Sequence, residues 1–150
     1  MVKEPNVIVA YPGKDHIEPK GRKEMEKEEI QALFVGNIIP RKGLCTLIEA
    51  LSDTEGLYLK VVGDKKVDPN YTEKVQNLIE KKELTHRTDL TGLVSDEKLD
   101  EMFRKSDLFV VPSLYEAYGI VYVEALGYGL PVIASARGGG SEIIEHGEEG

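Results

Sequence analysis

The chain has 150 residues, of which 41% are hydrophobic. This length and composition suit a single domain with a buried core and exclude both intrinsic disorder and two full domains. The 19 Lys and Arg residues stand against 27 Asp and Glu residues, for a formal net charge of −8. General binding to nucleic acid or to an anionic membrane is therefore disfavoured, although a small basic pocket could still hold a phosphate group.

The cysteine and histidine content argues against a disulfide bond and against a metal site. Cys45 is the only cysteine, and the three histidines are scattered along the chain without metal-ligand spacing. The longest apolar runs are too short to cross a bilayer, and the N-terminus lacks the apolar segment of a signal peptide. We therefore expect a cytoplasmic protein.

The first predicted elements are a strand at residues 6–11 and a highly charged stretch at residues 14–29. The charges of that stretch are mixed, so we interpret residues 1–29 as a strand plus a charged excursion leading into the domain. Strand-length apolar runs follow at residues 32–36 and 57–63. Between these two strands, four apolar residues recur at helical spacing and predict one buried helix face: Leu44, Leu47, Ile48 and Leu51.

The rest of the chain continues this alternation. Helices are predicted around residues 75–79, from Ser95 or Asp96 onward, and at about residues 119–127, with strands at residues 89–91, 108–111 and 130–134. Apolar strands that alternate with helices predict an α/β fold with a Rossmann-like parallel sheet covered by helices on both faces. Ligands bind such sheets beyond the carboxyl ends of the strands, so the loops there are the candidate site.

The most informative segment is residues 112–127, where Glu116 follows a predicted strand and Glu124 lies in the next helix. Gly119 lies near the start of that helix, where unpaired backbone N–H groups and the positive end of the helix dipole can hold a diphosphate. Carboxylates repel an anion but accept hydrogen bonds from sugar hydroxyls. Alternatively, both glutamates are ordinary solvated residues of an acidic protein.

This segment resembles the retaining GT-B glycosyltransferases, in particular those of family-4, the glycosyltransferase group 1 type. The match centres on a Glu-x7-Glu motif from Glu116 to Glu124. It extends to further motifs in the family's order, at residues 34–37, 41–43, 61–64, 91–94, 129–135, 138–139 and 142–144. The resemblance implies that residues 30–150 are the nucleotide-sugar-binding, C-terminal domain of one half of a GT-B fold, truncated at its C-terminus and without the acceptor domain.

The resemblance also implies catalytic roles for two side chains. Lys42 matches a lysine that contacts the donor diphosphate and stabilises charge on the departing nucleoside diphosphate. Glu116 matches a residue near the transferred sugar that stabilises an oxocarbenium-like transition state. Glu124 matches the residue that holds the ribose hydroxyls of the nucleotide.

The remaining donor contacts implied by the resemblance lie in the loops after the strands and at the helix start: Asn37, Arg41, Gly63, Val94, Tyr118, Gly119 and Ile120. Many relatives have an arginine in place of Asn37, so Arg41 is the candidate to replace that bidentate phosphate donor. Gly63 contacts the donor or simply makes a turn, and Val94 is placed to frame the base. The glycines at 138–140 form either a flexible loop or a close approach to substrate.

The function implied is that of a hexosyltransferase, active when full length. It would transfer a sugar from a UDP-, GDP- or ADP-sugar to an acceptor sugar or lipid with retention of configuration, as in polysaccharide or glycolipid biosynthesis. The nucleotide sugar is a substrate, so no cofactor is expected. No Asp-x-Asp motif is present to hold a metal, so we expect a metal-independent reaction. Two alternatives stay open: a nucleotide-sugar epimerase of GT-B architecture and a non-catalytic nucleotide-sugar-binding domain.

The missing acceptor domain limits what this chain is expected to do alone. We expect the fragment to bind nucleotide weakly and to be inactive by itself. The acceptor, and any contact with a membrane, would be reached through the missing domain. No nucleic-acid partner is expected from the acidic composition.

Overall fold

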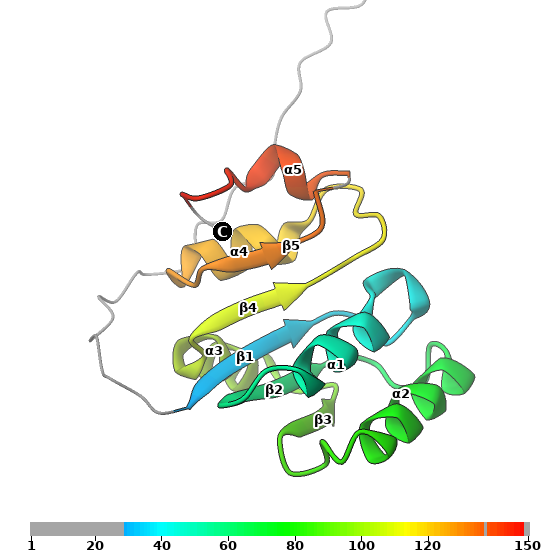
Figure 1. Ribbon diagram of the computed structural model, residues 1–150. Coiled ribbons are helices and arrows are strands. Elements are labelled where there is room, and N and C mark those ends of the chain that lie inside the picture. Colours follow the sequence, from blue (N-terminus) through cyan, green and yellow to red (C-terminus); the bar gives the residue numbers. More distant parts are fainter. Residues whose placement is uncertain (1–28, 137, 149–150) are drawn as a thin grey trace, which may run out of the picture.

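The computed structural model describes residues 29–136 and 138–148 (Figure 1). The predicted strand at residues 6–11, and the charged stretch up to residue 28, lie outside the described residues. Within the described part, five strands form one parallel sheet in the order β3-β2-β1-β4-β5. Their bounds are Ile30–Val35 for β1, Leu57–Val62 for β2, Thr88–Gly92 for β3, Leu108–Val111 for β4 and Val132–Ala134 for β5.

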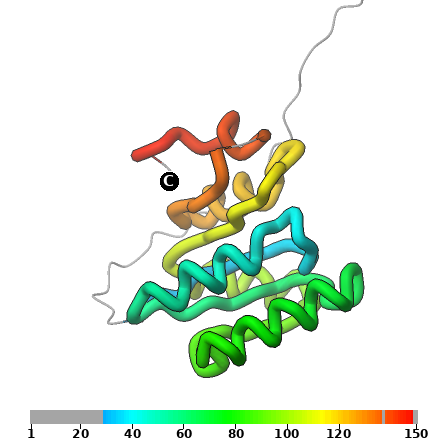
Figure 2. Tube along the Cα trace, turned by 45° about the vertical axis from the view of Figure 1, so that its right-hand side comes forward, coloured from blue at the N-terminus to red at the C-terminus, as the bar shows by residue number. Residues whose placement is uncertain are grey.

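The helices follow the strands as the apolar periodicity predicts. After the short 3-10 helix η1 (Pro40–Lys42), the helices are α1 (Leu44–Ser52), α2 (Pro69–Lys81), α3 (Asp96–Lys105), α4 (Ile120–Gly127) and α5 (Gly140–Ile143). Figures 1 and 2 show α1 and α2 on one face of the sheet, and α3 and α4 on the other. The prediction of a Rossmann-like parallel sheet with helices on both faces is confirmed.

The strand order reverses at β1: the chain adds β2 and β3 on one side of β1, then crosses over to add β4 and β5 on the other side. β1 pairs with β2 on one side, from Ile30 opposite Leu57 to Val35 opposite Val62. On its other side β1 pairs with β4, where Ala32 lies opposite Leu108. Because β1 and β4 are neighbours but not consecutive strands, their carboxyl ends open a crevice of the kind in which α/β sheets bind ligands.

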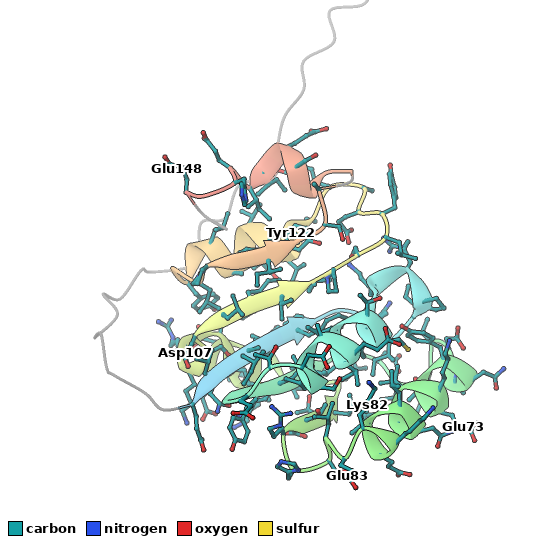
Figure 3. All side chains as sticks on the ribbon, in the orientation of Figure 1. Glu73, Lys82, Glu83, Asp107, Tyr122 and Glu148 are labelled. Atoms are coloured by element: carbon teal, nitrogen blue, oxygen red, sulfur yellow. The ribbon has the colours of Figure 1, made fainter. Side chains whose placement is uncertain are left out.

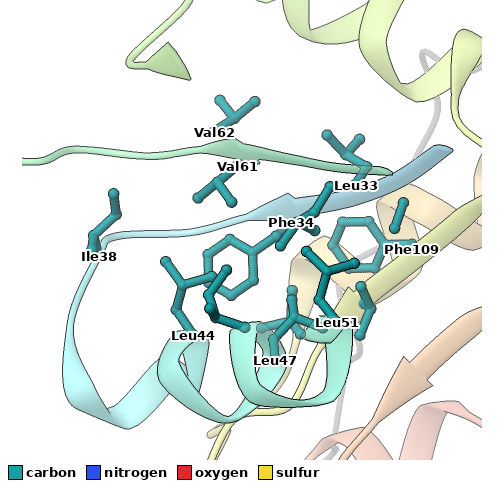
Figure 4. Packing of buried hydrophobic residues seen from close by; sticks show 14 of the residues in the cluster. Leu33, Phe34, Ile38, Leu44, Leu47, Leu51, Val61, Val62 and Phe109 are labelled. Carbon is teal, nitrogen blue, oxygen red and sulfur yellow. The ribbon is translucent and has the colours of Figure 1, made fainter. Parts of the chain in front are cut away.

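The core lies between the sheet and the helices on its two faces (Figure 4). Phe34 of β1 and Phe109 of β4 are fully buried. The helix face predicted for α1 is buried against the same strands through Leu44, Leu47, Ile48 and Leu51. Each such side chain stabilises the fold by roughly 1.5–3 kcal/mol, so the sheet and α1 form a firm base for the loops at the carboxyl edge.

Local hydrogen bonds fix where individual elements begin. The Ser95 side chain accepts a hydrogen bond from the Lys98 backbone N–H, so Ser95 caps α3 and Asp96 is its first residue. Asp107 lies just before β4 and accepts a hydrogen bond from the Gln31 backbone N–H of β1 at 2.9 Å (Figure 3). That bond joins the two central strands at the edge opposite the crevice.

Candidate functional site

The loops after β1 and β4 meet at the crevice and are tied to each other through their backbones. The Leu114 backbone N–H donates to the Arg41 carbonyl at 2.8 Å. Gly43 has a left-handed backbone with φ of 71°, and a Cβ atom there would lie 2.1 Å from the Pro112 carbonyl oxygen. Only glycine permits this approach, which brings η1 of the first loop against the second loop.

An ion pair between residues 74 positions apart links the two loops. Lys42 Nζ lies 2.6 Å from Glu116 Oε2, and the two side chains are only 12% and 13% exposed. The Lys42 stem runs over Gly36, where a Cβ atom would lie 3.3 Å from the lysine Cε. Two residues that the sequence analysis assigned to the site, Lys42 and Glu116, are therefore in direct contact.

The Glu116 carboxylate receives several donors on the same oxygen. Besides Lys42, the Ser113 hydroxyl donates to Oε2 at 3.2 Å, and Arg41 Nη1 lies 3.7 Å from it. Burial raises the pKa of Glu116, but the hydrogen bond and charge of Lys42, with Arg41 and Ser113, outweigh burial and hold the pKa below its usual value. Glu116 is therefore a carboxylate, not a carboxylic acid, at neutral pH.

Helix α4 begins beside this ion pair. Gly119 precedes the helix with φ of 88°, and a Cβ atom there would lie 2.4 Å from Cδ2 of Tyr122. In the part of the chain that the structure describes, no side chain caps this helix start. The Tyr122 N–H donates to the Gly119 carbonyl at 2.8 Å, so the N–H groups that α4 offers to an anion are those before it, beginning at Ile120.

The ion pair and the helix start line one hollow of about 530 Å³ at the carboxyl ends of β1 and β4. Glu124, one turn into α4, lies on the same lining. Seven of the residues predicted from the sequence are brought together there: Asn37, Lys42, Glu116, Tyr118, Gly119, Ile120 and Glu124. The hollow thus combines a cation, two carboxylates and the start of a helix.

Three other predicted residues do not line the hollow. The Arg41 guanidinium donates to the Tyr115 carbonyl at 2.8 Å, so its role as a replacement for an arginine at Asn37 stays a prediction. Gly63 is buried behind the hollow, where a Cβ atom would lie 1.9 Å from the Gly36 carbonyl oxygen. Val94 is half-buried against the core at the end of β3. Gly63 therefore serves the close packing of β1 and β2, and its predicted donor contact stays untested.

The glycines at 138–140 have a packing role that neither sequence interpretation included. The Gly139 backbone N–H donates to the Glu116 carbonyl at 2.7 Å, and Gly138 forms a parallel bridge with Glu116. A Cβ atom on Gly139 would lie 2.6 Å from the Tyr118 carbonyl oxygen. This loop therefore holds the backbone of the segment that carries Glu116.

Two site residues went unnoticed in the sequence. Ser113 is buried and bonds Glu116, and its only sequence signal is its position directly after the β4 strand and Pro112. Tyr122, labelled in Figure 3, is buried beside Gly119 and donates its phenolic hydrogen to the Val111 carbonyl at 3.0 Å. Burial raises the pKa of Tyr122, so its hydroxyl remains protonated. Apolar periodicity alone assigns Tyr122 to the core.

Two classes of site receive no support from the described residues. Among residues 29–136 and 138–148, no group of three or more His, Cys, Asp or Glu side chains is arranged to hold a metal ion. In the same ranges, no helix has both the length and the apolar character needed to span a membrane.

The sequence matches the family model described as Glycosyl transferases group 1 over residues 16–150. Among curated proteins, it is similar to an uncharacterised glycosyltransferase of Methanocaldococcus jannaschii, with 37% identity over 79% of this chain and 32% of that protein. It is also similar to mannosylfructose-phosphate synthase of Agrobacterium fabrum, with 30% identity over 77% of this chain and 27% of the relative. The chain thus spans about a third or less of these two relatives.

The solved structures that resemble the chain include Anabaena HepE in complex with UDP and glucose. That structure matches with a TM-score of 0.75 and 28% identity, over 80% of this chain and 33% of the Anabaena chain. The same Anabaena protein in complex with UDP-glucose matches with a TM-score of 0.75 and 29% identity, over 79% of this chain and 33% of that chain.

Proposed function

Because the chain belongs to the group 1 glycosyl transferases, we propose that it is the donor-binding part of an enzyme that transfers a sugar from a nucleotide sugar to an acceptor. The observation that carries this proposal is that Lys42, Glu116, Glu124 and the start of α4 line a single hollow. UDP and UDP-glucose, with which the Anabaena protein was solved, represent the proposed ligand class.

The diphosphate of the donor is proposed to lie between Lys42 and the start of α4. The lysine ammonium and the unpaired N–H groups of the first helical turn both attract negative charge. As the bond to the sugar breaks, charge accumulates on the leaving diphosphate, and fixed positive groups stabilise it. We propose that these groups take the place of a metal ion, so that transfer requires no metal and no cofactor.

Glu116 is proposed to face the transferred sugar. Burial raises the pKa of its carboxyl group, but Lys42, Arg41 and Ser113 together lower it by more, so the group is ionised at neutral pH. A carboxylate there can accept a hydrogen bond from a sugar hydroxyl and stabilise positive charge that develops at the anomeric carbon. Such a transition state is consistent with the proposed retention of anomeric configuration.

Glu124 is proposed to hold the ribose. It projects from α4 one turn beyond the proposed diphosphate position, while still lining the hollow. Paired ribose hydroxyls donate well to a carboxylate. The two glutamates therefore have separate proposed partners, one at each end of the diphosphate.

Donor binding must compete with the ion pair that exists in the free protein. Lys42 lies 2.6 Å from Glu116, so a diphosphate in the hollow has to draw the ammonium toward itself. The two oxygen-rich phosphate groups carry more negative charge than one carboxylate, which favours this exchange. The acceptor, a sugar or a lipid, is proposed to reach the site through parts of the protein beyond this chain.

A titration with UDP, GDP and ADP, followed by backbone NMR, tests the proposal. We expect resonances near Lys42, Gly119 and Glu124 to shift in a saturable way with at least one nucleotide. Residues near Ile133 and His146, at the far edge of the sheet, serve as an internal reference that should not move. Saturable shifts at that edge, with none around the hollow, would refute the proposal.

A further inference from the structure

In the hollow, both hydrogen bonds to the Glu116 carboxylate, and its ion pair with Arg41, converge on one of its two oxygens. Lys42 Nζ at 2.6 Å, Ser113 Oγ at 3.2 Å and Arg41 Nη1 at 3.7 Å are all measured to Oε2. Within the described ranges of the chain, no hydrogen bond or ion pair involves Oε1. Oε2 is therefore the anchored oxygen, and Glu116 itself lines the hollow.

The three side chains around Oε2 differ in length and in exposure. Lys42 and Arg41 are long, flexible side chains, and the Arg41 side chain is 46% exposed. Ser113 is short and 1% exposed, and its backbone N–H donates to the Val111 carbonyl at 2.9 Å. The serine is thus fixed directly to the end of β4, whereas Lys42 and Arg41 reach Oε2 through long side chains.

The Ser113 hydrogen is directed to Glu116 by its surroundings. Tyr122 also lies against the serine side chain, but its phenolic hydrogen goes to the Val111 carbonyl. The serine hydroxyl therefore has a charged acceptor in Glu116 and a neutral one in Tyr122. A hydrogen bond to an ionised acceptor is the stronger of the two, so the serine donates to the carboxylate.

We propose that Ser113 is a positioning residue that holds Oε2 of Glu116 in place when the donor diphosphate draws Lys42 away, so that Oε1 stays directed at the transferred sugar. This inference rests on the proposed function, in which Glu116 contacts the sugar and Lys42 contacts the diphosphate. Without Ser113, the loss of Lys42 would leave Oε2 with no hydrogen-bond donor among the described residues, and with the Arg41 guanidinium 3.7 Å away as its nearest cation. The Glu116 carboxylate would then be free to rotate, which exchanges the positions of Oε1 and Oε2.

The test compares Ser113→Ala, Ser113→Thr and Ser106→Ala in the full-length protein. Threonine keeps the hydroxyl, and Ser106 is a matched buried serine that donates to the Met102 carbonyl, away from the hollow. Carboxyl ¹³C NMR of glutamate-labelled protein gives the pKa of Glu116, with its signal assigned through Glu116→Gln. Each protein is titrated without nucleotide and with saturating UDP, GDP or ADP, whichever binds.

With nucleotide bound, we expect Ser113→Ala to raise the pKa of Glu116 by about one pH unit, and by less in the free protein, where Lys42 compensates. Ser113→Thr should restore the wild-type value, and Ser106→Ala should not change it. In turnover of the donor sugar, Ser113→Ala should lower kcat about tenfold with the KM for the donor unchanged within about twofold.

An equal pKa in Ser113→Ala and wild type, with nucleotide bound, would overturn the inference while leaving the proposed function intact. Failure of the proposed function is distinguishable, because nucleotide would then shift neither the Lys42 signals nor the Glu116 pKa in any variant. An equal fall in kcat in Ser113→Ala and Ser106→Ala would reduce Ser113 to an ordinary packing residue and also overturn the inference.

Discussion

Replacing Gly43 with alanine tests whether close contact between the two loops builds the site. An alanine at φ of 71° costs about 1–2 kcal/mol, because the left-handed region is unfavourable for a residue with a Cβ atom. The new Cβ would also lie 2.1 Å from the Pro112 carbonyl oxygen, which is backbone and cannot turn aside. Relieving that overlap costs a further 1–3 kcal/mol, roughly, by moving one loop.

Gly129→Ala is the matched control, because Gly129 has nearly the same φ, 72°, with no atom within 4 Å of the added Cβ. Urea unfolding of the full-length protein and both variants should show that Gly43→Ala lowers the free energy of unfolding by about 1–3 kcal/mol more than Gly129→Ala. Nucleotide affinity should fall only in Gly43→Ala, because Lys42 is displaced from the hollow. Equal losses of stability and unchanged nucleotide affinity in both variants would refute the reasoning.

Five further outcomes are expected. Glu124→Gln should weaken nucleotide binding about tenfold in calorimetry, and 2′-deoxynucleotides should lose affinity for the wild type more than for this variant. Asn37→Arg should tighten nucleoside diphosphate binding several-fold by adding a bidentate donor at the lining of the hollow; unchanged affinity would place the arginine elsewhere. The rate of sugar transfer by the full-length protein should be unchanged when EDTA is added. A nucleotide sugar incubated with the protein but without acceptor should keep the configuration of its sugar, whereas an epimerase would invert one stereocentre of that sugar. The pKa of Glu116 is lowered in the folded protein, so its ionised carboxylate stabilises the fold above the ordinary glutamate pKa of about 4.3. This stabilisation is lost as the pH falls through the lowered pKa. Glu116→Gln should abolish this pH dependence of stability in acid unfolding curves.

Within the described residues, the sequence was sufficient to predict the alternation of strands and helices. It also pointed to the carboxyl edge of the sheet, where the hollow lies. Apolar periodicity located the buried face of α1, and the alternation of strands and helices predicted the parallel sheet, both as observed. Most boundaries shifted by one or two residues, as for β1, which begins at Ile30 and ends before Gly36. Helix α2 differs more, because it begins at Pro69, six residues before the segment predicted around residues 75–79. Such shifts are expected, because hydrogen bonding rather than side-chain pattern sets the ends of strands.

What the sequence did not disclose depends on contacts between distant residues. The ion pair of Lys42 with Glu116 and the Ser113 bond to the same oxygen arise because β1 and β4 are neighbours in the sheet. No local pattern reports that adjacency. Gly63 likewise was interpreted as a turn or ligand-contact residue. In the structure, a side chain at this position would collide with the Gly36 backbone beside it.

The measurement that most directly tests the central claim compares nucleoside diphosphate with nucleoside in wild type and Lys42→Met, by calorimetry on the full-length protein. If the ammonium holds the diphosphate, the variant should bind the diphosphate about 10–100-fold more weakly and the nucleoside equally well, within about twofold. A variant that binds both ligands as tightly as the wild type does, or that loses both to the same extent, would contradict the account.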